Sequence, residues 1–351
     1  MIRKAGMAGL AMGLALAVAP AQAKAQEQQL QTIRIGTVNS IATVNNYTAI
    51  EKGWFKQYGI NVEIENLDTS ANVVALLATN RLQMIEGGIS AAYFNALEQK
   101  MPITIASDRI STPLNHKLLV RKDLEGKVTR IADLKGKMVA SNGTAAVTTY
   151  ELARLLESDG GTIKDIDIKI LAFPLQGAAF KNKAIDATLI IQPWGTSLVD
   201  DNSAFLLADP DNHVKVRPLT IAVTMINTDW AKQHQKLISD FFIAYMRSVR
   251  DYCVALHGGD NRKEMVDRVT RTGPLKDVAF IEKYPWPARN MNGEVNMASL
   301  LDMQDFFYEQ GFIKAKFAEQ QLVTRQYTDN AMKVLGPVPQ VNPASKIEGC
   351  R

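Results

Sequence analysis

Side chains that commonly carry catalysis or bind metals are scarce in this sequence of 351 residues. It has two cysteines, Cys253 and Cys350, and four histidines. Two cysteines so far apart do not have the spacing of a zinc site, and neither an H-E-x-x-H motif nor a G-x-S-x-G nucleophile turn occurs. These absences argue against a zinc hydrolase and a serine hydrolase. We therefore expect a protein with no catalytic residue, no metal site and no cofactor.

Long apolar runs and an excess of one charge are also missing from most of the chain. The formal net charge is +4, but Arg3, Lys4 and Lys24 lie near the N-terminus, and without them it is +4 − 3 = +1. A nearly neutral chain lacks the basic footprint of a nucleic-acid-binding protein, so no nucleic-acid partner is expected. No later stretch approaches the roughly 20 apolar residues that span a bilayer. At roughly 100–200 residues per domain, two domains are expected.

The N-terminal segment, residues 1–25, has the pattern of a secretory signal peptide. Arg3 and Lys4 precede an uncharged run of small and apolar residues, Gly6–Ala19, and two overlapping Ala-x-Ala cleavage patterns follow it. The alternative is a membrane anchor, which the short length of the apolar run disfavours. The sequence therefore predicts an exported protein.

The two cysteines leave two interpretations open. Cys253 lies in an apolar helical run, "FFIAYMRSVRDYCVAL", where a buried free thiol is common. Cys350 is next to the last residue, and in an oxidising compartment a disulfide could join the tail to that helix.

Strand and helix patterns alternate along the chain. The predicted strands include Thr32–Val38, Ile60–Glu65, Pro102–Asp108 and Pro218–Asn227. The predicted helices include Ala145–Glu157, Asp229–Leu256, Arg262–Thr270 and Met297–Gln310. Alternation of this kind favours two α/β series, each around a largely parallel sheet. Because ligands bind outside the carboxyl ends of such strands and in clefts between domains, the pattern predicts a two-lobed clamp.

Three segments, taken in order, carry a resemblance to a known family. They are "AIEKGWFKQYGINVEIE", "ADLKGKMVASNGT" and "YPWPARNMNGEVNMASLLDMQDFFYEQGFI". Together they resemble bacterial ABC-transporter substrate-binding proteins, and most closely the branch for nitrate, taurine, alkanesulfonates and thiamine-pyrimidine precursors. The similar region extends from Ile33 to about Lys333. One departure is "ATNRLQM", in which Asn80 and Gln83 stand where the branch often has Gly and Asp.

The resemblance implies a type II periplasmic-binding-protein fold, with two α/β lobes joined by two crossover strands. Residues 32–112 and 225–345 would form the first lobe, and residues 113–224 the second lobe with the hinge strands. We place the crossovers at His116–Arg121 and Leu219–Thr224. The family and the leader together imply a periplasmic monomer. Its partners would be a small anionic ligand and an ABC permease at the inner membrane.

The turn of the second lobe, Ser141–Thr144, is predicted to open a helix that faces the cleft. The first N–H groups of a helix lack internal partners and lie at the positive end of its dipole, so they can hold an anion without a charged side chain. Gly143 would let the backbone approach closely. The candidate contacts are Asn142, Gly143, Thr144 and Ala145. The alternative is a plain N-cap formed by Asn142 or Thr144.

The matching turn of the first lobe is "EGGISAAYF", where Ser90 could cap a helix and also donate its hydroxyl to a ligand. Its candidate contacts are Gly88, Ser90 and Ala91. The family resemblance places three further residues on the same wall, namely Asn39, Ser40 and Ile41.

Four longer side chains complete the candidate site. Gln176 and Gln192 each follow a predicted strand, and an amide can donate or accept a hydrogen bond. Trp194 could lie against an apolar part of the ligand, or it could simply pack beside Pro193. Arg109 ends a strand before the hinge, where a guanidinium would bind a carboxylate or sulfonate through two hydrogen bonds. Its alternatives are a salt bridge to Asp108 and simple exposure to solvent.

We predict a solute-binding component that captures a small organic anion, such as a sulfonate, a taurine-like molecule or a carboxylate, by hinge closure. A second hypothesis is a protein that binds or synthesises the thiamine-pyrimidine precursor. The resemblance implies that such an enzyme needs a clustered cysteine motif, which two distant cysteines do not supply. A third hypothesis is a sensor that reports ligand to a membrane receptor. The sequence does not separate transport from sensing.

Overall fold

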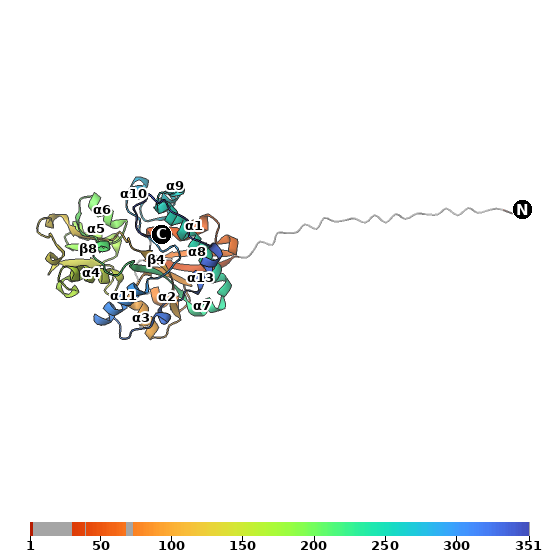
Figure 1. Cartoon of the computed structure of the whole chain (residues 1–351), viewed down its shortest axis with the longest axis horizontal. Coiled ribbons are helices and arrows are strands. Elements are labelled where there is room, and N and C mark those ends of the chain that lie inside the picture. Colours follow the sequence, from red (N-terminus) through yellow and green to blue (C-terminus); the bar gives the residue numbers. More distant parts are fainter. Residues whose placement is uncertain (3–29, 39, 68–72, 351) are drawn as a thin grey trace.

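The computed structural model describes residues 1–2, 30–38, 40–67 and 73–350. Most of the predicted signal peptide therefore lies outside the described residues, and its assignment remains a prediction. The chain forms two α/β lobes that lie beside each other (Figure 1). Within the described ranges, no helix has both the length and the apolar character needed to cross a membrane.

The first lobe is built on a five-stranded sheet with the order β2-β1-β3-β10-β4. The strands are β1 (Gln31–Thr37), β2 (Ile60–Asn66), β3 (Met84–Gly88), β4 (Ile103–Ser111) and β10 (Thr220–Asn227). Strand β1 is parallel to β2 and β3, whereas β10 runs antiparallel to β3 and β4. Successive side chains of a strand face opposite sides. Thus Met84 and Ile226 enter one apolar core, and their neighbours Ile85 and Met225 enter another.

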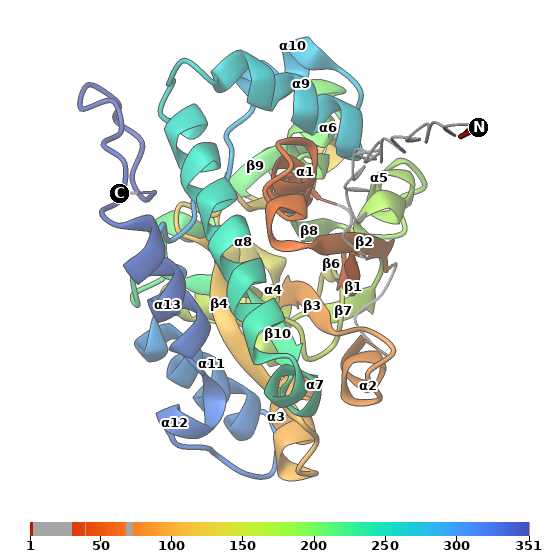
Figure 2. The same cartoon turned by 90° about the vertical axis from the view of Figure 1, so that its right-hand side faces the viewer.

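Helices cover both faces of this sheet. One face carries α1 (Val44–Glu51), α8 (Gln235–Leu256), α9 (Arg262–Thr272) and α13 (Gln326–Leu335). The other carries α2 (Val73–Ala78), α3 (Ala91–Glu98) and α11 (Met297–Glu309). The shorter helices are α7 (Thr228–Gln233), α10 (Val278–Lys283) and α12 (Glu319–Leu322). Figure 2 shows α13 beside the long helix α8. The single helix predicted over Asp229–Leu256 is divided at His234, whose Nδ1 bonds to the Trp230 carbonyl.

The second lobe has its own five-stranded sheet with the order β7-β6-β8-β5-β9. The strands are β5 (Lys117–Arg121), β6 (Met138–Ser141), β7 (Asp167–Ile170), β8 (Ala187–Ile190) and β9 (Ala204–Ala208). Helix α4 (Val147–Ser158) covers one face, and α5 (Phe173–Lys181) and α6 (Trp194–Asp200) cover the other. The 3-10 helices are η1 (Ile41–Thr43), η2 (Lys56–Tyr58), η3 (Lys122–Leu124), η4 (Ile131–Leu134), η5 (Ile163–Asp165) and η6 (Pro210–Asn212).

Two connections join the sheets, through residues 112–116 and 209–219. They run side by side, because Thr112 N–H donates to the Leu219 carbonyl at 3.1 Å and Leu219 N–H donates to Thr112 Oγ1 at 3.2 Å. The predictions of crossover strands at His116–Arg121 and Leu219–Thr224 both need correction. Residues 117–121 belong to β5, which pairs with β8 and β9 within the second sheet. Residues 220–224 belong to β10, which pairs on both sides within the first sheet and is buried along its whole length.

Candidate functional site

A cavity lies where the two lobes meet. Its inner part, of about 80 Å³, is lined by residues of both lobes, and we call it the inner cavity. It adjoins an outer cleft of about 770 Å³ that shares six of its lining residues, among them Gly88, Asn142 and Phe173. Together they fall in the size range of small-molecule binding sites.

Most of the inner cavity wall is apolar. The first lobe contributes Ile41, Ile110 and Ile221, and the second contributes Val147, Phe173 and Ile191. Polar groups are few and come from Ser40, Arg109, His116, Asn142, Thr148 and Gln192. A mostly apolar wall with a few placed polar groups suits a ligand that has a polar head and a hydrocarbon or aromatic body.

The two predicted turns do meet, but they bond to each other. Ser90 and Ala146 form an antiparallel bridge between the lobes, and Ala91 N–H donates to the Ala145 carbonyl at 3.0 Å. Gly88 lies so close to the second lobe that a Cβ built on it would be 3.0 Å from Cγ1 of Val147. The two lobes are therefore in contact beside the cavity.

Helix α4 begins later than predicted, at Val147 and not at the turn. Hydroxyl groups hold the turn out of the helix, because Thr149 Oγ1 and Ser141 Oγ both bond to the Gly143 carbonyl and Thr148 Oγ1 bonds to Asn142. The residues at the inner cavity are accordingly Asn142, Val147 and Thr148. Gly143, Thr144 and Ala145 line neither the inner cavity nor the outer cleft. The positive end of the helix dipole still faces the cavity, but the first turn of α4 supplies it.

Arg109 lines the inner cavity and is almost fully buried. Its Nε donates to Glu86 Oε2 at 3.0 Å, and its Nη2 donates to the hydroxyls of Thr37 at 2.9 Å and Thr43 at 3.2 Å. Its Nη1 has no hydrogen-bond partner in the part of the chain that the structure describes. The alternative pairing with Asp108 is not found, since Glu86 takes that place. The guanidinium is thus held rigidly, with one nitrogen left for a ligand.

Asp108 instead fixes the end of β4 to the segment that follows α10. Its carboxylate accepts hydrogen bonds from Ser111 Oγ at 2.5 Å and from the Asn290 N–H at 3.0 Å. Burial raises the pKa of Asp108 to about 6, although these hydrogen bonds act in the opposite direction. The same segment places Pro287 at the inner cavity.

The two predicted glutamines have internal partners. Gln176 is buried within the second lobe, where Nε2 donates to the Leu171 carbonyl at 2.9 Å and Oε1 accepts from Thr188 at 2.7 Å. Because α5 begins at Phe173, Gln176 is inside a helix and not at a strand end, so the prediction that it faces the cleft is corrected. Gln192 does line the inner cavity, where its Oε1 accepts from Thr196.

The remaining candidates are divided between the two spaces. Ser40 and Ile41 line the inner cavity, and Ser90 and Trp194 line the outer cleft. Ala91 lines neither of them. Asn39 lies outside the described residues.

Sequence reasoning missed the buried Glu86 at the site and interpreted His116, a lone histidine at a strand start, as structural. Glu86 is a single acid within an apolar strand, and His116 lies in the first connection with Nδ1 at 3.0 and 3.1 Å from the carboxylate oxygens of Glu151. A lone acid in an apolar stretch was the only signal available for Glu86, and for His116 the signal was its place near the predicted hinge. Among the described residues, no cluster of three or more histidine, cysteine or acidic side chains is arranged to hold a metal ion.

Comparison with known proteins shows which family and which solved structures this chain is similar to. A family model described as NMT1/THI5 like matches residues 40–255, which is more than half of the chain. No curated protein matches the sequence. Among solved structures, the alkanesulfonate-binding protein SsuA from Xanthomonas axonopodis pv. citri, bound to MOPS, is 19% identical with a TM-score of 0.68, and the match covers 84% of this chain and 98% of that one.

Two further structures are similar. The periplasmic nitrate-binding protein NrtA from Synechocystis PCC 6803 is 13% identical with a TM-score of 0.70, covering 89% of this chain and 92% of that one. The desulfurization enzyme DSZB is 13% identical with a TM-score of 0.60, covering 87% and 100%. At such low identity these similarities establish the fold alone. The predicted two-lobed periplasmic-binding-protein fold is confirmed.

Proposed function

Because this chain belongs to the NMT1/THI5-like family of periplasmic-binding-protein folds, we propose that it is the solute-binding component of an ABC importer. It captures a small organic anion between its lobes in the periplasm and delivers it to a membrane permease. The observation that carries this proposal is the inner cavity, an apolar space between the lobes with Arg109 and the start of α4 on its wall.

The size and lining of the site support an anion with an organic part. A sulfonate or carboxylate head suits the inner cavity of about 80 Å³, and a hydrocarbon or aromatic body suits the outer cleft of about 770 Å³. Main-chain donors and a guanidinium hold an anion without attacking it, so the ligand leaves unchanged. SsuA and NrtA, which share the fold, bind an alkanesulfonate and nitrate respectively.

A thermal-shift screen of the mature protein tests the proposal. We expect at least one alkanesulfonate, taurine-like compound or organic carboxylate to raise the melting temperature by several degrees, because binding to the folded state alone stabilises it. Nitrate and neutral pyrimidines are included for comparison. A response to pyrimidines with none to any anion would contradict the proposal and favour the thiamine-precursor hypothesis.

An enzyme is the second candidate, since DSZB shares the fold. Against it, both cysteines are joined to each other and neither lines the inner cavity, so no thiol is offered to a ligand there. Mass spectrometry of ligand recovered after prolonged incubation separates the two candidates. A chemically changed ligand would overturn the binding-protein proposal.

Closure of the lobes is expected to depend on Asp302. Tyr150 OH donates to its Oδ2 at 2.5 Å, and Arg154 donates to both oxygens at 3.1 and 2.9 Å. Tyr150 and Arg154 lie on α4 in the second lobe, whereas Asp302 lies on α11 in the first, so these bonds cross between the lobes. They lie outside the inner cavity and act on the helix whose first turn borders it.

We predict that Asp302→Asn weakens binding of the best anion of the screen by about tenfold, because a bidentate charged contact is lost only from the closed form. Isothermal titration gives the affinity, and small-angle scattering gives the fraction of open protein. Asp305→Asn is the matched control, since Asp305 pairs with Lys316 within the first lobe. Equal affinities for the two variants would contradict a role of Asp302 in closure.

A further inference from the structure

We infer that His116 is a ligand-binding residue of the inner cavity, whose ring is held by Glu151 so that Nε2 donates a hydrogen bond to an anionic oxygen of the ligand. This inference rests on the proposed function and names a donor for the anionic head. It also makes capture of the anion depend on the protonation of one side chain.

Glu151 fixes the orientation of the ring. Both of its carboxylate oxygens lie within hydrogen-bond distance of His116 Nδ1, at 3.0 and 3.1 Å. Glu151 is fully buried on α4, one turn after Val147 and Thr148, which line the inner cavity. The helix that borders the cavity therefore also sets the direction of the imidazole.

The other ring nitrogen is available to a ligand. His116 lines the inner cavity and is nearly buried, with 5% of its side chain exposed. Among the described residues Nε2 has no hydrogen-bond partner, yet it is not one of the fully enclosed polar atoms that lack one. The exposed part of the ring therefore includes Nε2, and the residue that carries it borders the inner cavity between the lobes.

The bond to Glu151 decides what Nε2 can do. A carboxylate only accepts, so Nδ1 must carry a proton. In the neutral ring, Nε2 is then a bare acceptor that repels an anionic oxygen. In the charged ring, Nε2 carries a proton and donates to that oxygen. An anionic oxygen therefore binds at Nε2 only when the ring is charged, and its binding draws in a proton wherever the free protein holds the neutral ring.

The charged groups around the ring favour this form. They are Glu151 on α4, Asp209 and Asp211 after β9, Lys117 bonded to Asp209, and Arg109 across the cavity bonded to Glu86. Burial lowers the pKa of His116, but the charge and hydrogen bond of Glu151, with the charges of Asp211 and Asp209, outweigh it. The pKa therefore lies above its ordinary value, which keeps the charged ring accessible near neutral pH.

Calorimetric titration with 1-octanesulfonate, benzoate and nitrate at pH 5.5, 6.5, 7.5 and 8.5 tests the inference. We expect affinity of the probes that bind to fall by about tenfold as the pH rises through the range, with uptake of up to about one proton per anion at the high end. Titration in two buffers of different ionisation enthalpy measures that uptake. His116→Asn should lower affinity at pH 5.5 by about tenfold or more and abolish the pH dependence.

Two further variants keep the test clear of folding effects. His116→Leu leaves the buried Glu151 without its partner, so the double variant His116→Leu/Glu151→Leu is compared with it, and both should lack the pH dependence. His213→Asn is the matched control, because His213 bonds to Ser158 in a separate groove outside the inner cavity. It should leave affinity and pH profile unchanged.

Nitrogen-15 spectra of the histidine rings give an independent readout, in which a probe added at pH 7.5 should produce the Nε2–H signal of His116. A probe that binds wild type and His116→Asn equally, with a flat pH profile, would overturn the inference and leave the proposed function intact. Failure of every anion to bind wild type would overturn both.

Discussion

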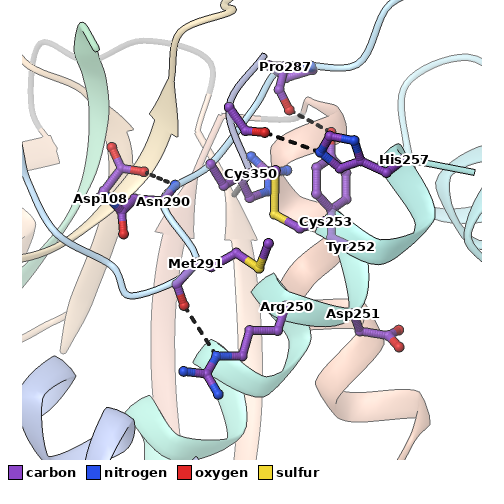
Figure 3. Close-up of a disulfide and its surroundings, with 12 residues drawn as sticks. Asp108, Arg250, Asp251, Tyr252, Cys253, His257, Pro287, Asn290, Met291 and Cys350 are labelled. Atoms are coloured by element: carbon purple, nitrogen blue, oxygen red, sulfur yellow. Dashed lines mark hydrogen bonds between the residues drawn. A yellow bond between two sulfur atoms is a disulfide. The ribbon is translucent and has the colours of Figure 1, made fainter. Parts of the chain in front are cut away.

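Loss of the bond between Cys253 and Cys350 is expected to lower the free energy of unfolding by about 4–5 kcal/mol. The two cysteines are joined across a sequence separation of 97 residues, so the bond closes a long loop of the unfolded chain. In the chain-entropy account, a loop of that length gives near the largest stabilisation that one disulfide provides. Figure 3 shows the bond between helix α8 and the C-terminal tail.

The bond also holds the tail against the first connection between the lobes. Gly349 has a φ of +77°, and a Cβ built on it would be 2.7 Å from the Thr112 carbonyl oxygen and 2.6 Å from Ala288. Only glycine fits such an approach without displacing its neighbours. Since residues 112–116 lead to His116, release of the tail is expected to loosen the side of the cavity nearest the hinge.

Urea unfolding of the oxidised and the reduced wild-type protein measures the loss of unfolding free energy without replacing a side chain. Cys350→Ser provides the variant, because serine is nearly the same size as cysteine and Cys350 lies on the tail and not on α8; both cysteines are buried, at 2% exposure for Cys350 and 0% for Cys253. The variant and the reduced protein should agree within about 1 kcal/mol. A difference between oxidised and reduced protein below about 1 kcal/mol would contradict the prediction.

The sequence alone left the pairing of these cysteines open, and for a physical reason. Spacing along a chain does not tell whether a tail returns to a helix 97 residues earlier, because that contact is set by the tertiary fold. Local patterns were more informative. Strands such as β2 and β10 were predicted to within a few residues, since the alternation of apolar and polar residues in β2 and the apolar run of β10 are properties of the segments themselves.

The site was predicted less well than the fold. The turn before α4 was placed in the correct region, but its hydroxyl bonds delay the helix to Val147, and they involve side chains up to eight residues apart. Gln176 was misplaced because it was expected to follow a strand, whereas α5 already begins at Phe173. Glu86 was missed and His116 was interpreted as structural because each side chain pairs with a residue distant in the sequence, Arg109 and Glu151 respectively.

Substitution of one member of the Arg109–Glu86 pair should destabilise the protein by about 3–5 kcal/mol, because it leaves an uncompensated charge in the interior. Both side chains are almost fully buried, at 2% and 0% exposure, and Nε lies 3.0 Å from Oε2. Asn46 also donates to Glu86, at 2.9 Å, so the carboxylate is held from two sides. We expect this cost for Arg109→Met and for Glu86→Leu alike.

The double variant Arg109→Met/Glu86→Leu separates the structural role of the pair from its role in binding. Replacing both charges with apolar groups of similar size leaves no buried charge unpaired, so its stability should lie within about 1–2 kcal/mol of wild type and above either single variant. The surface pair Arg34–Glu63 is the matched control. Its side chains are 55% and 57% exposed, and Glu63→Gln should change stability by less than about 1 kcal/mol.

Anion binding by this stable double variant then decides whether Arg109 contacts the ligand. If Nη1 binds the anionic head, affinity should fall by more than about tenfold in the double variant although the fold is intact. Arg109→Lys keeps the charge but loses the planar fork, so its affinity should lie between those of wild type and the double variant. Wild-type affinity in a folded double variant would exclude Arg109 from the site. It would then leave the start of α4 and His116 as the donors for the anion.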